Sequence, residues 1–166
     1  MKNELSLQNL IKVMRDQLEI YKELFNLAEK KTDVLIKGDV KILGEITEIE
    51  QDLIIKLGKL EEERYDIVSK IAKKHNIEVN EATTEFFMKL LSSEEKEDFS
   101  AICDELKTVL PQINEKNQQN EKLIKNALEY INFSINLLTD TGDIKANYSA
   151  DGVNTRKDFH FIDKKA

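Results

Sequence analysis

The sequence predicts an all-α fold: a long antiparallel helical hairpin, a third long helix that completes a coiled-coil-like bundle, and a flexible C-terminal tail. Five glycines and one proline in 166 residues leave few of the residues that tight hairpin turns need. Apolar residues recur at alternating spacings of four and three, which is typical of packed helices. A composition of 40% hydrophobic and 34% charged residues fits one modest domain.

The first predicted helix carries a seam of apolar and small residues over four heptads. It ends at residues 37–39, because Gly38 suits the left-handed backbone that closes a helix and Asp39 can accept hydrogen bonds from the free amides of the next one. The seam residues are Leu7, Ile11, Met14, Leu18, Tyr21, Phe25, Ala28, Thr32 and Leu35.

The second predicted helix covers residues 39–75 and repeats this spacing. The connection is so short that the two helices must lie antiparallel. Counting outward from the turn places Arg64 within about one helical turn of Asp16, so we expect these two charges to pair. The seam is formed by Leu43, Ile46, Glu50, Leu53, Leu57, Leu60, Arg64, Ile67 and Ile71.

A connector at residues 75–80 precedes a short predicted helix at 81–91, whose apolar residues form a plug at one end of the bundle. Ser92 and Glu95 match a capping box and open a third helix over residues 93–139. Because proline removes a backbone hydrogen bond, Pro111 predicts a kink or break near Leu110 that divides this helix in two. The plug residues are Phe86, Phe87, Leu90 and Leu91.

Beyond Thr139 the sequence is polar, contains glycine and lacks an apolar stripe. We therefore expect a helical domain over residues 1–140 and a flexible tail over residues 141–166. Two short aromatic segments in the tail resemble docking motifs: residues 148–152, which begin with Tyr148, and residues 158–162, which contain Phe159 and Phe161.

Residues 123–138 hold more apolar side chains than one buried helix face requires. The surplus surface must pack inside the bundle, against a twin subunit or against a client protein. Just upstream, Asn117 and Asn120 fall on seam positions. They are either buried residues that fix the helix register or solvated residues beyond the cover of the hairpin.

Composition argues against several classes of function. A net charge of -7 disfavours nucleic acid and anionic lipid as partners. No stretch reaches membrane-spanning length, and the single cysteine, Cys103, fits a reducing, cytoplasmic environment. His75 and His160 lack partners at a metal-ligand spacing, and no base is identifiable for Cys103. We expect no enzyme activity, no cofactor and no bound metal.

Several segments together resemble the FlgN-type flagellar export chaperones. The most specific are Leu-Ile-Lys-Gly-Asp at residues 35–39 and Tyr-Ser-Ala-Asp-Gly at residues 148–152. Further matching segments lie at residues 19–24, 27–31, 50–51, 60–64 and 130–138. The resemblance spans most of the chain as far as Gly152.

The resemblance implies a cytoplasmic chaperone that binds the C-terminal helices of the hook-filament junction proteins FlgK and FlgL. It keeps them unassembled and delivers them to the export gate protein FlhA, which Tyr148 and Gly152 are expected to contact. The expected client-binding residues are Ile124, Leu128, Ile131, Ile135 and Leu138, with Phe133 beside them. A client-free homodimer is possible, and the alternative is a self-associating structural coiled-coil adaptor with no export role.

Overall fold

The computed structural model describes residues 2–148, with side chains for residues 5–140. Over this range the regular elements are four α-helices and one short 3-10 helix, so the all-α prediction is confirmed. The helices are α1 (Lys2–Lys37), α2 (Val40–Lys74), α3 (Thr84–Leu90) and α4 (Ser93–Tyr148), and the 3-10 helix η1 is Val79–Glu81. The described residues fall into two units, one that ends at Lys125 and one that begins at Asn126, and α4 contributes to both.

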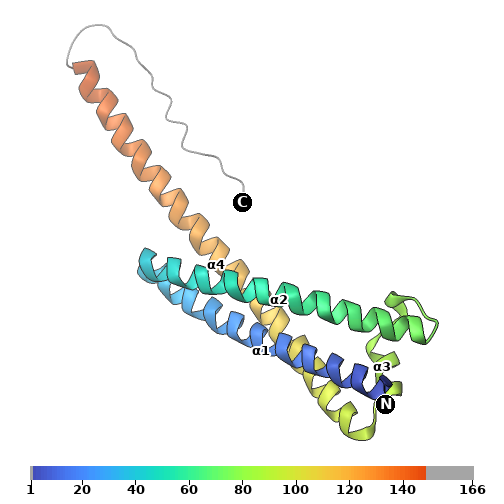
Figure 1. Ribbon diagram of the computed structural model, residues 1–166. Coiled ribbons are helices and arrows are strands. Elements are labelled where there is room, and N and C mark those ends of the chain that lie inside the picture. The colour runs from blue at the N-terminus through green and yellow to red at the C-terminus, as the bar shows by residue number, and fades with distance from the viewer. Residues whose placement is uncertain (1, 149–166) are drawn as a thin grey trace. The chain divides into compact units, whose positions relative to one another are not determined.

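In the first unit, α1 and α2 form the predicted antiparallel hairpin (Figure 1). Gly38 adopts a φ of +72°, and the Asp39 side chain accepts a hydrogen bond from the Ile42 amide at 3.1 Å. These are the two local events that the residues 37–39 predict, and they reverse the chain within two residues.

The α4 residues of the first unit run parallel to α1. Arg15 pairs with Asp98 at 3.0 Å and Lys22 with Glu105 at 2.6 Å, so a step of seven residues on one helix matches seven on the other. Since α2 is antiparallel to α1, the three helices form an up-down-up bundle.

The main core lies between the start of α1, the end of α2, α3 and the start of α4. The predicted plug is confirmed: Phe87 and Leu91 are buried in this core, and Phe86 and Leu90 pack against it. Phe87 contacts the rings of Phe86 and Phe99 at centroid distances of 5.3 and 6.1 Å. A smaller cluster of Leu27, Ile46 and Leu53 joins α1 to α2 near the turn.

The capping box at the start of α4 is present as predicted. The Ser92 amide and hydroxyl donate to Glu95 Oε2 at 3.0 and 2.8 Å, and the Glu95 amide donates to Ser92 Oγ at 3.4 Å. The two residues satisfy each other's free groups and define where the helix begins.

The prediction that Pro111 divides the third helix is wrong, because α4 continues through it. The residues on both sides are held against the core: Val109 is buried, and Leu106 and Ile113 pack on the same cluster. Lys107, whose carbonyl loses its partner at Pro111, is exposed, so that carbonyl can be hydrated. Packing therefore outweighs the local cost of proline.

Two further differences concern helix length and charge pairing. The helix α4 ends at Tyr148 rather than Thr139, since a single Gly142 costs only about 1 kcal/mol in a helix and nothing else stops it. Arg64 pairs with Glu61 of its own helix, not with Asp16. The predicted height of Arg64 along the hairpin is nearly right. Gln17, next to Asp16, donates to the same Glu61 carboxylate at 2.8 Å.

Candidate functional site

The apolar side chains of α4 between residues 124 and 138 are exposed to solvent. Their exposed fractions run from 41% to 75%, whereas Phe99, Ile102 and Val109, nearer the start of the same helix, are buried. Exposed apolar residues scattered singly are ordinary on a protein surface, whereas a continuous series on one helix marks a contact surface. The exposed series comprises Ile124, Leu128, Tyr130, Ile131, Phe133, Ile135, Leu137 and Leu138.

In the second unit most of these side chains, together with Ala127 and Ser134, fall into two adjacent rows along the helix. With about 100° between successive residues, Leu128, Ile131, Ile135 and Leu138 share one stripe, which we call the client seam. Ala127, Tyr130, Ser134 and Leu137 share the neighbouring stripe, which we call the second seam. The centres of the two seams lie about 100° apart around the helix, and together the seams cover about half of its circumference.

Phe133 lies outside both seams. Its position around the helix places it opposite the client seam and about 40° from Leu137, so it flanks the second seam. The sequence interpretation placed Phe133 beside the client-binding stripe, and the helix geometry assigns it to the other edge of the apolar surface.

The two seams are nearly free of charge. Between residues 126 and 139 the only charged residue is Glu129, in a chain of which 34% is charged. The remaining polar residues there are asparagine, serine and threonine. A partner would therefore be recognised through shape and apolar contact, and long-range charge attraction would contribute little.

Ile124 belongs to the first unit, where it lines an open groove of about 490 Å³. Leu24, Ile54 and Ile113 supply the other apolar side chains of this groove. Its polar residues include Lys31 and Glu50, which form an ion pair with side chains only 17% and 14% exposed.

Asn120 lines the same groove, and the structure separates the two readings that the sequence leaves open for Asn117 and Asn120. Asn120 is buried, 3% exposed, and donates through Nδ2 to the Ala28 carbonyl at 2.9 Å. Thr32 Oγ1 lies 2.6 Å from Asn120 Oδ1 and completes a small polar network between α1 and α4. Asn117 is exposed, so only one of the two asparagines occupies the register position.

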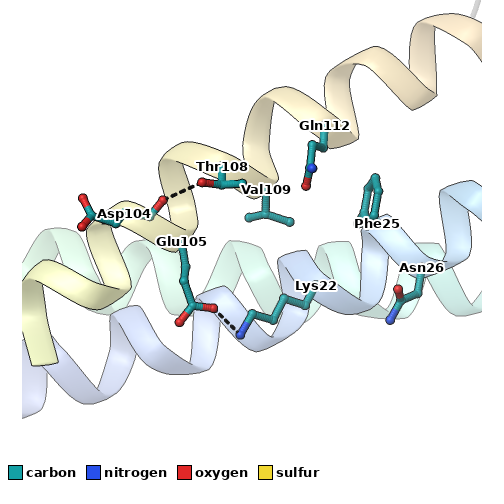
Figure 2. Close-up of a pocket in the computed structure, with 8 residues that line it drawn as sticks. All are labelled: Lys22, Phe25, Asn26, Asp104, Glu105, Thr108, Val109 and Gln112. Atoms are coloured by element: carbon teal, nitrogen blue, oxygen red, sulfur yellow. Dashed lines mark hydrogen bonds and ion pairs between the residues drawn. The ribbon is translucent and has the colours of Figure 1, made fainter.

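A second groove, of about 460 Å³, runs between α1 and α4 in the first unit (Figure 2). Phe25 and Val109 form its apolar part, and the Lys22–Glu105 ion pair crosses it. The bond to Glu105 raises the pKa of the Lys22 ammonium. The ion pair links the two helices across the groove. Because each of its charges already has a partner, the pair offers no free group for catalysis.

The pKa shifts of Cys103 and Glu61 follow from packing and hydrogen bonding, not from a catalytic arrangement. Burial raises the pKa of the Cys103 thiol, which packs against the main core and so favours its neutral, unreactive form. The hydrogen bond from Arg64 lowers the pKa of Glu61, and the bond from Gln17 adds to it. Within residues described by the structure, no three His, Cys, Asp or Glu side chains gather as metal ligands would.

The predicted docking residues can be placed only in part. Tyr148 is the last residue of α4, and the description of side chains stops before it. Gly152, Phe159, Phe161 and His160 lie outside the described residues. Within the helices that the structure describes, none is long and apolar enough to cross a membrane.

Comparison with known proteins assigns the family. An uncharacterised protein, YvyG of Bacillus subtilis (strain 168), is 26% identical over 137 residues, which cover 81% of this chain and 81% of that protein. No solved structure matches. The sequence model of the FlgN protein matches residues 1–156, nearly the whole length, and it includes the hairpin, all of α4 and the segment at 148–152. The chain therefore belongs to the FlgN family of flagellar export chaperones.

Proposed function

We propose that this chaperone works in the cytoplasm and holds the C-terminal helices of the hook-filament junction proteins FlgK and FlgL on the client seam of α4. The observation that carries the proposal is the exposure of Leu128, Ile131, Ile135 and Leu138 along one face of a helix. An amphipathic client helix presents apolar residues at the same period, so the two can pack side by side. Ile124, one turn earlier in the same pattern, is the further client-binding residue we expect.

Holding a client in this way keeps it unassembled without consuming ATP. The apolar face that the client would use in the filament is covered while it is bound. Release follows when a competing docking event or unfolding at the export gate removes the client. We assign the docking step to FlhA, with Tyr148 and Gly152 as the contact residues, because the segment at 148–152 matches the family's pattern.

The test of client binding uses purified chaperone with the C-terminal segment of FlgK or FlgL from the same bacterium. Ile131→Asp and Ile135→Asp place a charge in the middle of the client seam, and binding measured by calorimetry should fall at least a hundredfold. Ile55→Asp is the matched control, because Ile55 is exposed to a similar degree (59%, against 51% for Ile131) but lies on α2. Equal binding by all three variants and the unchanged chaperone would refute the proposal.

Gel filtration with light scattering separates the proposal from the structural adaptor. A chaperone should form a defined complex with the client, whether the free protein is a monomer or a homodimer. A constitutive homo-oligomer that does not bind either client would favour the adaptor. In a separate pull-down with the cytoplasmic part of FlhA, Tyr148→Ala should reduce capture of the chaperone–client complex while leaving client binding intact.

A further inference from the structure

A single client helix that packs on the client seam of α4 would leave the second seam exposed. A single helix needs an apolar stripe of about 100°, whereas the exposed apolar surface of residues 127–138 spans about 180°. Tyr130 and Leu137 would therefore stay in water beside a bound single helix, flanked by Phe133 on their outer side. All three side chains are more than half exposed.

We propose that the occupant of this surface is a pair of amphipathic helices from one client molecule, one helix on each seam. This inference rests on the proposed client-binding function and deepens it, because it states what the client must look like: a helical hairpin with little charge on its inner face. The two seams have the same seven-residue period, in steps of three and four, so each one matches the repeat of a packed helix.

The shape of the second seam supports a helix as its occupant. Ala127 and Ser134 lie seven residues apart on its inner edge, beside the client seam, and Tyr130 and Leu137, also seven apart, form its outer edge. Small residues repeated along one side allow a second helix backbone to come close, and the larger residues beside them fill the space between its side chains.

The exposed apolar area of α4 also favours two client helices over one. At on the order of 100 Å² for each large, half-exposed side chain, the four residues of the client seam offer on the order of 400 Å². That is about half of one side of a standard protein–protein interface, about 800 Å². Tyr130, Leu137 and Phe133 add on the order of 300 Å², which brings the surface close to the standard size.

The experiment compares two probes against variants of each seam. The probes are full-length FlgL from the same bacterium and a synthetic peptide of its C-terminal helix, about 20 residues long. Leu137→Asp changes the second seam, Ile131→Asp the client seam, and Asn136→Asp adds the same charge on the polar face as a matched control. Circular dichroism checks that α4 stays helical, and no core contact is removed because these side chains are exposed.

We expect Leu137→Asp to weaken the binding of full-length FlgL at least tenfold and to leave the binding of the single-helix peptide within twofold. Ile131→Asp should weaken both, and Asn136→Asp neither. A photo-crosslinker at position 131 and one at position 137 should label two client segments that belong to separate helices.

Three outcomes would overturn the inference. Unchanged FlgL affinity of Leu137→Asp, with Ile131→Asp still disruptive, means that a single helix is the occupant and leaves the proposed function standing. Dissociation of a chaperone dimer by Leu137→Asp without loss of client affinity assigns the second seam to a second copy of this chain. Unchanged binding by every variant refutes the proposed function as well.

Discussion

Thr32 and Asn120, 88 residues apart in the sequence, meet inside the bundle with Oγ1 and Oδ1 2.6 Å apart. Both side chains are buried, and the Asn120 amide also donates to the Ala28 carbonyl. A buried polar pair stabilises only the alignment in which both groups find each other, so it excludes neighbouring registers of α4 against α1.

Replacing one member of this pair should cost more than replacing both. We expect Asn120→Leu to lower the free energy of unfolding by about 1–3 kcal/mol, because the Ala28 carbonyl loses the Asn120 amide and the buried Thr32 hydroxyl keeps only its bond to that same carbonyl. The double variant with Thr32→Val should recover part of the loss. Urea denaturation followed by circular dichroism gives the values, and a double variant that is less stable than either single one would contradict this account.

The ion pair of Lys31 and Glu50 should contribute more to the free energy of unfolding than the more exposed ion pairs do. Glu50→Gln leaves the Lys31 ammonium largely buried without its counter-charge, and we expect a loss of about 1–3 kcal/mol in unfolding free energy. Glu105→Gln, which breaks the more exposed pair with Lys22, is the comparison and should cost clearly less. The two variants can be compared in one denaturant series, and a larger loss for Glu105→Gln would reverse the ranking.

The capping box at Ser92 should make stability depend on pH in acid. Hydrogen bonds from the Ser92 amide, and then from its hydroxyl, lower the pKa of Glu95 below its ordinary value of about 4.3. Since the folded pKa is the lower one, the stabilisation is fully present above the ordinary value and disappears as the pH falls through the folded pKa. Glu95→Ala should cost about 0.5–1 kcal/mol at pH 7, and its deficit should shrink below pH ~4. Thermal melts of the unchanged protein and of Glu95→Ala at several values between roughly pH 3 and pH 7 measure this dependence. The range brackets the ordinary glutamate pKa of about 4.3.

Pro111→Ala should stabilise the protein. Alanine supplies the backbone amide that proline lacks and allows the hydrogen bond to the Lys107 carbonyl, in a helix interior where proline costs up to about 3 kcal/mol. We expect a gain of about 1–3 kcal/mol in unfolding free energy by urea denaturation. A loss of stability would mean that the packing of Val109 and Ile113 against the core requires the local geometry that Pro111 imposes.

The features predicted correctly from sequence are those set by a few neighbouring residues. The turn at Gly38 and Asp39, the capping box at Ser92 and Glu95 and the apolar plug around Phe87 each follow from local backbone and side-chain rules. The all-α class and the surplus of apolar residues on α4 follow from the period and number of apolar residues, whereas the sequence left open whether that surplus is exposed. They needed no knowledge of which helix packs on which.

The errors arise where tertiary packing decides. One seam was assigned to α1, but α1 packs against both α2 and α4, so it also buries Leu10, Val13, Gln17 and Leu27. The local strain of Pro111 predicts a break, but the core contacts of Val109 and Ile113 on either side keep the helix continuous. The outcome for Asn117 and Asn120 depended on the crossing of α1 and α4, which places only Asn120 beside Ala28 and Thr32.

Glu129 is the only charged residue between residues 126 and 139, and by the helical period it lies outside both seams, which has a thermodynamic consequence. Binding that rests almost wholly on the burial of apolar surface is driven by the release of water from that surface. The affinity for the client should therefore rise on warming and fall on cooling toward about 0 °C. Calorimetry of the client complex should give a large negative heat-capacity change. Added salt, which weakens charge-guided complexes, should hardly loosen this one.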